Sequence, residues 1–531
     1  MKVLLMHRHK DFDLYQLPLP NRYSRRQERD REALLRALLW NGASLIQDLE
    51  LDTLLHAMAG GDEFVFEVAE QALLTGLQSD LDTILYRQSI LKDCLKNPTV
   101  VRGMYALTTA AIERTRQQWW ALSSDYPASM LYSAIDMLKT SNGALRTLRG
   151  VAEQNAVDFV SDGFTALFAM LRNELSEEYL ATIKEHLNEL KFRKGILLSA
   201  QLGESNEGTR YMLRKSQGKE PGWLDRILGK VPPSYTFNLD PHDETGGKIM
   251  SDMRNRGMVR VARATAESAN HVLSFFKLLR TELAFYIGCL NLHEQLLSKG
   301  MPINFPIPQP AGQRQCESRG LYDVCLVLTM RRAVVGNTLH ANGKNLVVIT
   351  GANQGGKSTF LRSIGLAQLM MQCGLFVGAE AFESEICPAL FTHYKREEDT
   401  TMKSGKFDEE LARMSALADH IVPRSILLFN ESFAATNERE GADIAGQIVR
   451  ALLHKGMKVF YVTHLYEFAR SLFDEKRAGT IFLRAERKDD GTRTFKLVEG
   501  KPLETSYGED LYQEVFETRP PDNCSTVPTQ V

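Results

Sequence analysis

Residues 349–360 read ITGANQGGKSTF, and this stretch constrains the fold more than any other part of the chain. The spacing Gly351-x-x-x-x-Gly356-Lys357-Ser358 is that of a phosphate-binding loop, whose glycines let main-chain N–H groups close around phosphate oxygens. An apolar run, Leu346 to Ile349, precedes the loop and a helical pattern follows it. The sequence therefore predicts an α/β domain with a mostly parallel sheet and the loop at a strand end.

Two further apolar runs end at polar residues, Ile426 to Phe429 before Asn430-Glu431 and Val459 to Val462 before Thr463-His464. Because parallel strands present ligands at their carboxyl ends, we expect these residues near the loop. Nucleotide hydrolases normally carry an acidic pair here, so Glu431 is predicted to polarise a water molecule, while Asn430 offers only a neutral carbonyl to a metal-bound water. His464 could bond the γ-phosphate or the attacking water, or be an ordinary polar residue after a strand.

Composition limits the class of protein. At 531 residues the chain has room for roughly two to four domains of about 150 residues. No apolar run approaches the ~20 residues of a membrane span, and no secretory signal is visible, so we expect no membrane association and a cytoplasmic location. The net charge of −2 means that nucleic-acid binding would need local basic patches. Seven scattered cysteines without a C-x-x-C pair indicate reduced thiols.

The pattern along the chain predicts an all-α core and lever region before the α/β domain. Apolar residues recur at helical spacing from about 26 to 193, one possible strand lies in GILLSAQL, and a long helix runs from roughly 251 to 298. The domains that we expect are an N-terminal extension (1–25), a helical core (26–193), an irregular connection or vestigial clamp (194–250), a lever helix (251–305), an ATPase domain (306–510) and a flexible tail (511–531).

Five segments carry a resemblance to a known family. They are TGANQGGKSTFLRSIGLAQLMMQCGLFVGAE, FTHYKREEDTTMKSGKFDEELARM, SILLFNESFAATNEREGADIAGQIVRALL, FYVTHLYEFA and TSYGED. In order and spacing they resemble the P-loop ATPase domain of the MutS family of DNA mismatch repair proteins, which is of the ABC type. The resemblance is strongest over about 320–510, and the long helix resembles the lever helix of that family.

The resemblance implies a magnesium-dependent ATPase that works as a homodimer through its ATPase domains and has DNA as a partner. Lys357, Glu431 and His464 then take catalytic roles, while Ser358 and Asn430 bind Mg²⁺. Ser404 and Gly405 lie near the signature loop that completes the ATP site of the opposite subunit. The implied nucleotide-binding residues are Val334, Val335, Asn337, Gly351, Ala352, Asn353, Gln354, Gly355, Gly356, Lys357, Ser358 and Thr359.

The chain also departs from the family pattern. The family's mismatch-reading and connector domains find no room before residue 26, SGKFDEE replaces the usual Ser-Thr-Phe core of the signature, and Asn430 replaces an acidic metal partner. The expected protein is therefore a reduced MutS-like ATPase that couples head closure to the repair or recombination of mismatched or branched DNA. The alternative is a nucleotide-gated assembly protein with slow hydrolysis. A transporter-type or chromosome-structure ATPase lacks support, because no Leu-Ser-Gly-Gly-Gln signature or long coiled coil is seen.

Overall fold

The computed structural model describes residues 2–10, 39–122, 126–193, 195–204, 207–214, 235–236, 238–330, 333–396, 405–488 and 491–504. It divides into two compact units. The first unit contains Met1–Leu4 and Asn97–Leu283, and the second contains Leu5–Lys96 and Ala284–Val531. None of the helices in the described segments combines the length and the apolar character needed to cross a membrane.

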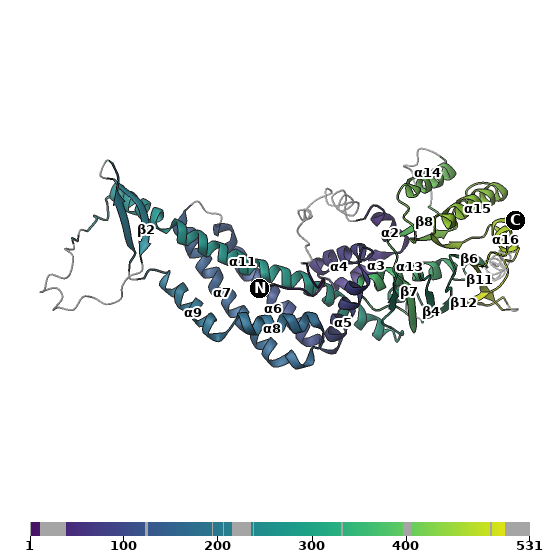
Figure 1. Cartoon of the computed structure of the whole chain (residues 1–531), viewed down its shortest axis with the longest axis horizontal. Helices are drawn as coiled ribbons and strands as arrows, with labels where there is room; N and C mark the ends of the chain where they lie inside the picture. The colour runs from purple at the N-terminus through teal and green to yellow at the C-terminus, as the bar shows by residue number, and fades with distance from the viewer. Residues whose placement is uncertain are drawn as a thin grey trace, which may run out of the picture. The chain divides into compact units, whose positions relative to one another are not determined.

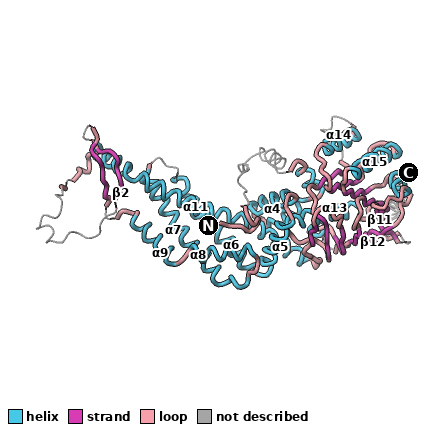
Figure 2. Tube along the Cα trace, in the orientation of Figure 1, coloured by secondary structure: helices cyan, strands magenta, loops and turns pink. Residues whose placement is uncertain are grey.

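The first unit is a set of helices with one hairpin (Figures 1 and 2). Its helices are α6 (Pro98–Leu122), α7 (Pro127–Asn155), the 3₁₀ turn η1 (Ala156–Asp158), α8 (Asp162–Glu174), α9 (Glu177–Glu189) and the first part of α11 (Glu244–Ser298). Helix α7 packs on α11 through small and unbranched side chains, among them Ala134, Met137, Ala266 and Ala269. Small residues allow two helix axes to approach closely, and this contact forms one of the apolar clusters of the unit.

The hairpin joins β1 (Leu197–Leu202) to β2 (Gly208–Arg214) in antiparallel register. The strand predicted in GILLSAQL is confirmed as β1, whereas β2 was not predicted. The hairpin approaches α11 at Gly257, where an added Cβ atom would lie 2.4 Å from Cδ2 of Leu198. Glycine at this position therefore gives the hairpin room to lie on the helix.

The second unit carries a six-stranded sheet with the order β12-β11-β6-β10-β9-β8. All neighbouring pairs are parallel except β11 and β12. The strands are β6 (Leu346–Gly351), β8 (Leu390–Tyr394), β9 (Ile426–Asn430), β10 (Lys458–Val462), β11 (Thr480–Arg487) and β12 (Arg493–Glu499). The three predicted strands are thus confirmed as β6, β9 and β10, and they are neighbours.

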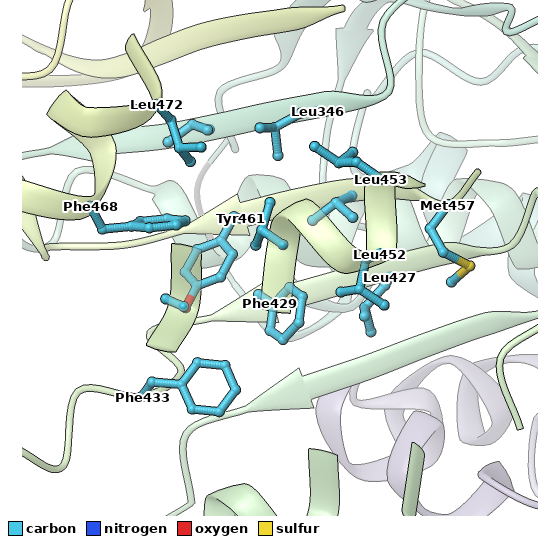
Figure 3. Packing of buried hydrophobic residues seen from close by; sticks show 14 of the residues in the cluster. Leu346, Leu427, Phe429, Phe433, Leu452, Leu453, Met457, Tyr461, Phe468 and Leu472 are labelled. Carbon is cyan, nitrogen blue, oxygen red and sulfur yellow. The ribbon is translucent and has the colours of Figure 1, made fainter. Parts of the chain in front are cut away.

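Helices cover both faces of this sheet, because its parallel strands are buried on both sides. On one face, Phe429 and Tyr461 pack with α14 (Lys406–Ala418), α15 (Glu438–His454) and α16 (Tyr466–Asp474) in a single apolar cluster (Figure 3). On the other face lies α13 (Lys357–Cys373), where an added Cβ at Gly365 would lie 2.8 Å from Leu428. The strands of this sheet therefore lie between α13 on one face and α14, α15 and α16 on the other.

A second, four-stranded sheet has the order β3-β7-β4-β5. Its strands are β3 (Ile307–Gln309), β4 (Cys316–Leu321), β5 (Asn337–His340) and β7 (Ala381–Glu385), and the remaining helices of this unit are α2 (Gly42–Asp48), α3 (Leu51–Ala59), α4 (Glu63–Gly76), α5 (Leu81–Lys96), α12 (Val324–Thr329) and the end of α11. This sheet was not predicted, because its short strands lack a distinct apolar run. Helix α11 begins at Glu244, seven residues before the predicted start.

The six cysteines in the described ranges are all buried thiols of the second unit. They are Cys94, Cys289, Cys316, Cys325, Cys373 and Cys387. Burial raises the pKa of the thiols of Cys94, Cys289, Cys325, Cys373 and Cys387. All six act as small apolar side chains in a packed core and expose no thiol to solvent.

Candidate active site

The loop between β6 and α13 has the backbone that its glycines predict. Gly351 and Gly356 adopt φ of 106° and 87°, a region that favours glycine. Gly355 is required for a different reason, since an added Cβ would lie 2.6 Å from Cβ of Ala485 and 2.9 Å from the carbonyl oxygen of Ala352. Helix α13 then begins at Lys357, so its free N–H groups point toward the loop.

Lys357 is folded into this loop. Its Nζ donates hydrogen bonds to the carbonyl oxygens of Gly351 at 2.9 Å and Ala352 at 3.0 Å, and the residue is buried. Burial lowers the pKa of Lys357. The ammonium group is therefore held next to the helix N-terminus, in a setting that favours an anion.

Ser358 and Asn430 meet at the edge of the sheet. The Ser358 hydroxyl donates a hydrogen bond to Oδ1 of Asn430 at 2.8 Å, although the two residues are 72 positions apart. Asn430 is the last residue of β9. The pair presents two neutral oxygens, and oxygen is the ligand atom that Mg²⁺ prefers.

Glu431 follows in a left-handed backbone conformation with φ of 53°. Its main-chain N–H donates to the carbonyl oxygen of Val462, the last residue of β10, at 2.9 Å. Oε2 of Glu431 lies 3.9 Å from Nδ1 of His464, and both side chains are partly exposed. The sheet thus brings the predicted carboxylate and the predicted imidazole together.

Two cavities meet at Glu431 and Asn353. The first, of about 400 Å³, is lined by residues 353–360 of the loop and helix start, by Tyr322, by residues 333–335 and by Phe495. The second, of about 380 Å³, is lined by His464, Thr463 and Tyr466 among others. A volume of this size suits a small-molecule ligand, and Glu431 borders both spaces.

The predicted nucleotide-binding residues Val334, Val335 and Asn337 are of two kinds. Val334 and Val335 line the first cavity. Asn337 also borders it, but its side chain holds β12, donating from Nδ2 to the carbonyl oxygen of Phe495 at 3.1 Å and accepting at Oδ1 from the N–H of Leu497 at 2.8 Å. The amide of Asn337 is therefore already engaged in joining β5 to β12.

Sequence reasoning missed Phe495, Tyr322 and Arg493. Phe495 is 48% exposed and borders the first cavity, which places an aromatic ring at its wall. Arg493 donates from Nη1 to Oε1 of the loop residue Gln354 at 3.1 Å. Phe495 and Arg493 reach the loop because β12 pairs with β11 and is bonded by Asn337, and nothing in the local sequence GTRTFKLVE indicates these contacts.

Some predicted site residues lie outside the described segments. Ser404 is among them, and Ser506, Tyr507 and Gly508 of the TSYGED segment also lie outside the described residues. Gly405 is described and precedes α14, which begins at Lys406. In the described ranges, no group of three or more His, Cys, Asp or Glu side chains is placed to hold a metal ion.

Comparison of the sequence with known proteins shows which family the chain resembles. The family model for the MutS2 N-terminal domain matches residues 79–299, and the model for MutS domain V matches residues 347–516, which include the loop and the strand ends described above. The chain belongs to the MutS family. The resemblance seen in the sequence is thereby confirmed.

Individual MutS relatives match different shares of the chain. It is 24% identical to the mouse MutS protein homolog 4 over 298 residues, covering 53% of this chain and 30% of the relative. It is 33% identical to the DNA mismatch repair protein MutS of Thermotoga sp. strain RQ2 over 169 residues, covering 32% of this chain and 21% of the relative. With the DNA mismatch repair protein MutS of Streptococcus mutans serotype c, the identity is 23% over 407 residues, covering 72% and 46%. The chain spans less than half the length of each of these MutS relatives.

Proposed function

We propose that this chain binds ATP with Mg²⁺ at the loop after β6 and hydrolyses the bond to the γ-phosphate. The observation that carries the proposal is the convergence of Lys357, Ser358 and Glu431 around one cavity, beyond the ends of β6 and β9, which flank β10 in the sheet. Positioning and electrostatic stabilisation account for most of the catalysis of phosphoryl transfer, and these residues supply both. Membership of the MutS family supports the same function.

In this proposal the loop and the start of α13 hold the phosphates. Residues 353–359 line the cavity and supply main-chain N–H groups to the phosphates, and the ammonium of Lys357 exchanges its two loop carbonyls for phosphate oxygens. Val334 and Val335 provide an apolar wall for the base. Phe495 offers a ring face on which the base can stack.

Ser358 and Asn430 fit a magnesium ion because both offer an oxygen at the same edge of the sheet. When bound, Mg²⁺ supplies positive charge that stabilises the phosphate oxygens. Glu431 orients and polarises the attacking water. His464, whose Nδ1 lies 3.9 Å from Oε2 of Glu431, senses the γ-phosphate.

The test of this function is ATP hydrolysis by the purified chain and by two variants. Lys357→Ala should abolish nucleotide binding, whereas Glu431→Ala should keep binding and lower turnover by about 10²-fold or more. Binding is measured with a fluorescent ATP analogue and turnover by phosphate release. Equal turnover in Glu431→Ala and the wild type would remove Glu431 from the mechanism.

DNA is the proposed partner, and α11 supports this proposal. Between Lys248 and Arg263 the helix carries five basic residues and one acidic residue. Arg256, Arg260 and Arg263 are exposed and follow one another at spacings of four and three, so they lie on one face. Such a row of guanidinium groups suits a phosphate backbone, and it is a local patch of the kind that the net charge of −2 requires.

The arginine row gives a direct test of DNA binding. In Arg260→Gln/Arg263→Gln, the slope of log Kd against log salt should fall by roughly one for each phosphate that an arginine no longer neutralises. The matched control is Arg116→Gln/Arg146→Gln, which removes the same charge from residues that pair with Glu113 and Glu177. An equal weakening of DNA binding in both variants would show that only net charge matters.

A second candidate function, a nucleotide-gated assembly protein with slow hydrolysis, is favoured by Asn430. Its neutral amide lies where a carboxylate would attract Mg²⁺ more strongly. Turnover stimulated by homoduplex, mismatched or branched DNA would support the first function. Tight ATP binding without any response to DNA would support the second. Both candidate functions include a homodimer formed through an ATPase domain at 306–510. Both also keep the other domains predicted from the sequence.

A further inference from the structure

The peptide that carries Glu431 has an unusual backbone. Glu431 and Phe433 both adopt positive φ, 53° and 63°, although neither is glycine. A non-glycine residue in this region costs of order 1 kcal/mol, so the conformation persists only where neighbouring groups enforce it. The segment from Glu431 to Phe433 therefore needs anchors on several sides.

Strands β10 and β8 supply the first anchors. The N–H of Glu431 donates to the carbonyl oxygen of Val462 at 2.9 Å, and the Tyr461 hydroxyl donates to the carbonyl oxygen of Ser432 at 2.9 Å. The Ser432 hydroxyl lies 2.8 Å from Nδ1 of His393, a buried residue of β8. The first two residues of the segment are thus fixed from two strands.

The last anchor comes from helix α14. Glu410 is fully buried, and its Oε2 accepts a hydrogen bond from the N–H of Phe433 at 2.9 Å. Its other oxygen, Oε1, has no hydrogen-bond partner among the described residues. Nε2 of His393 lies 3.0 Å from the main-chain carbonyl oxygen of Glu410, so β8 and α14 brace the segment together.

Burying a carboxyl group is costly, and here the cost is offset by one hydrogen bond from a main-chain N–H. Burial raises the pKa of Glu410, as expected for a carboxyl group removed from water. An apolar side chain at this position would fill the core equally well but would leave the N–H of Phe433 without an acceptor. What Glu410 contributes beyond an apolar side chain is therefore the hydrogen bond that fixes the main chain at Phe433, two residues after Glu431.

We propose that Glu410 is a positioning residue, which holds the carboxylate of Glu431 at the cavity by fixing the Glu431–Phe433 peptide. The proposal rests on the proposed function, because Glu431 orients water only if the chain hydrolyses ATP. Glu410 is not among the residues that line the two cavities described above, so it acts through Glu431.

The test compares three single variants of the full chain. Glu410→Ala removes the acceptor, and turnover should fall by about 10-fold or more while ATP binding is retained, since small misplacements of a catalytic group have such effects. Glu410→Gln keeps an acceptor oxygen for Phe433 and should restore most of the turnover. Glu409→Ala is the matched control, because this neighbouring carboxylate pairs with Arg413 instead; its turnover should equal that of the wild type.

A double variant separates positioning from general stability. If Glu410 acts through Glu431, Glu410→Ala should lower turnover no further in a Glu431→Ala background. A purely structural role would instead reduce ATP binding and thermal stability in both backgrounds. Full turnover in Glu410→Ala, or a parallel reduction of ATP binding, would overturn the proposal.

Hydrogen exchange tests the same idea without ATP hydrolysis, so it separates failure of this inference from failure of the proposed function. Main-chain N–H groups in a peptide covering residues 431–433 should exchange faster in Glu410→Ala than in the wild type, and their exchange should be unchanged in Glu409→Ala. Identical exchange in Glu410→Ala and the wild type would overturn the positioning role even if the chain showed no turnover.

Discussion

Asn430 makes the proposed magnesium position neutral. Its Oδ1 accepts from Ser358 at 2.8 Å, and an aspartate could accept the same hydrogen bond while adding a negative charge. Asn430→Asp should therefore lower the Mg²⁺ concentration for half-maximal turnover by about tenfold. A magnesium titration of turnover measures the change.

The control for this substitution is Asn437→Asp, which adds the same charge at the N-cap of α15. Aspartate caps a helix as well as asparagine does, so this variant should titrate like the wild type. Unchanged Mg²⁺ dependence in Asn430→Asp would mean that other ligands place the metal.

His393 gives the fold a dependence on pH. Burial, assisted by the charge of Arg413, lowers the pKa of His393 from 6.5 to about 4, so the folded chain binds this proton less readily than the unfolded chain. The stability that this group contributes should therefore be fully present above pH 6.5 and fall as the pH drops toward 4. From pH 7 to pH 5 the free energy of unfolding should fall by about 2 kcal/mol on account of this group.

Denaturant unfolding of the wild type and His393→Gln at both pH values checks this expectation. The raised pKa values of Asp48 and Glu410 act in the opposite direction, so the informative quantity is the difference between the two proteins. The variant should lose about 2 kcal/mol less than the wild type on acidification. Parallel losses in the two proteins would contradict the assignment.

At the scale of elements, the loop after β6 depends on a close approach to β11. Gly355→Ala should destabilise the chain by about 1–3 kcal/mol and weaken ATP binding, because the added methyl group meets Ala485 and the Ala352 carbonyl. Gly103→Ala is the contrasting case, an exposed position in α6 with no atom near the added Cβ. It should stabilise the chain by roughly 0.5–1 kcal/mol. Denaturant unfolding and ATP titration compare the two, and a shift in the same direction would contradict the packing described.

Three strands of the large sheet could be predicted from the sequence, but some residues near the site could not. β6, β9 and β10 were predictable because each is a continuous apolar run ending at polar residues. Glu410 was not, since SGKFDEELARM reads as an ordinary helix with polar residues facing water. Its burial depends on contacts with β8 and the Glu431–Phe433 segment, and Phe495 is held by Asn337, which lies 158 positions earlier in the chain. Local patterns predict the strand ends, and tertiary contacts decide which polar residues are buried between them.

At the scale of the whole molecule, the proposed homodimer should respond to nucleotide. In Glu431→Ala, where bound ATP persists, ATP with Mg²⁺ should double the mass measured by light scattering after gel filtration. Lys357→Ala, which should not bind ATP, serves as the control and should keep its mass. A monomer in both variants with ATP would remove the dimer from the proposed function.

The buried cysteines of the second unit can report when that unit opens, because their thiols react with a reagent only when they become exposed. Residues 97–283 of the first unit contain no cysteine, and the six described thiols all lie inside the second unit. Once Cys524, outside the described residues, has been replaced, an alkylating reagent can react only when the second unit opens. The rate of alkylation in native buffer therefore reports the opening of that unit alone, and bound ATP should slow it in proportion to its occupancy.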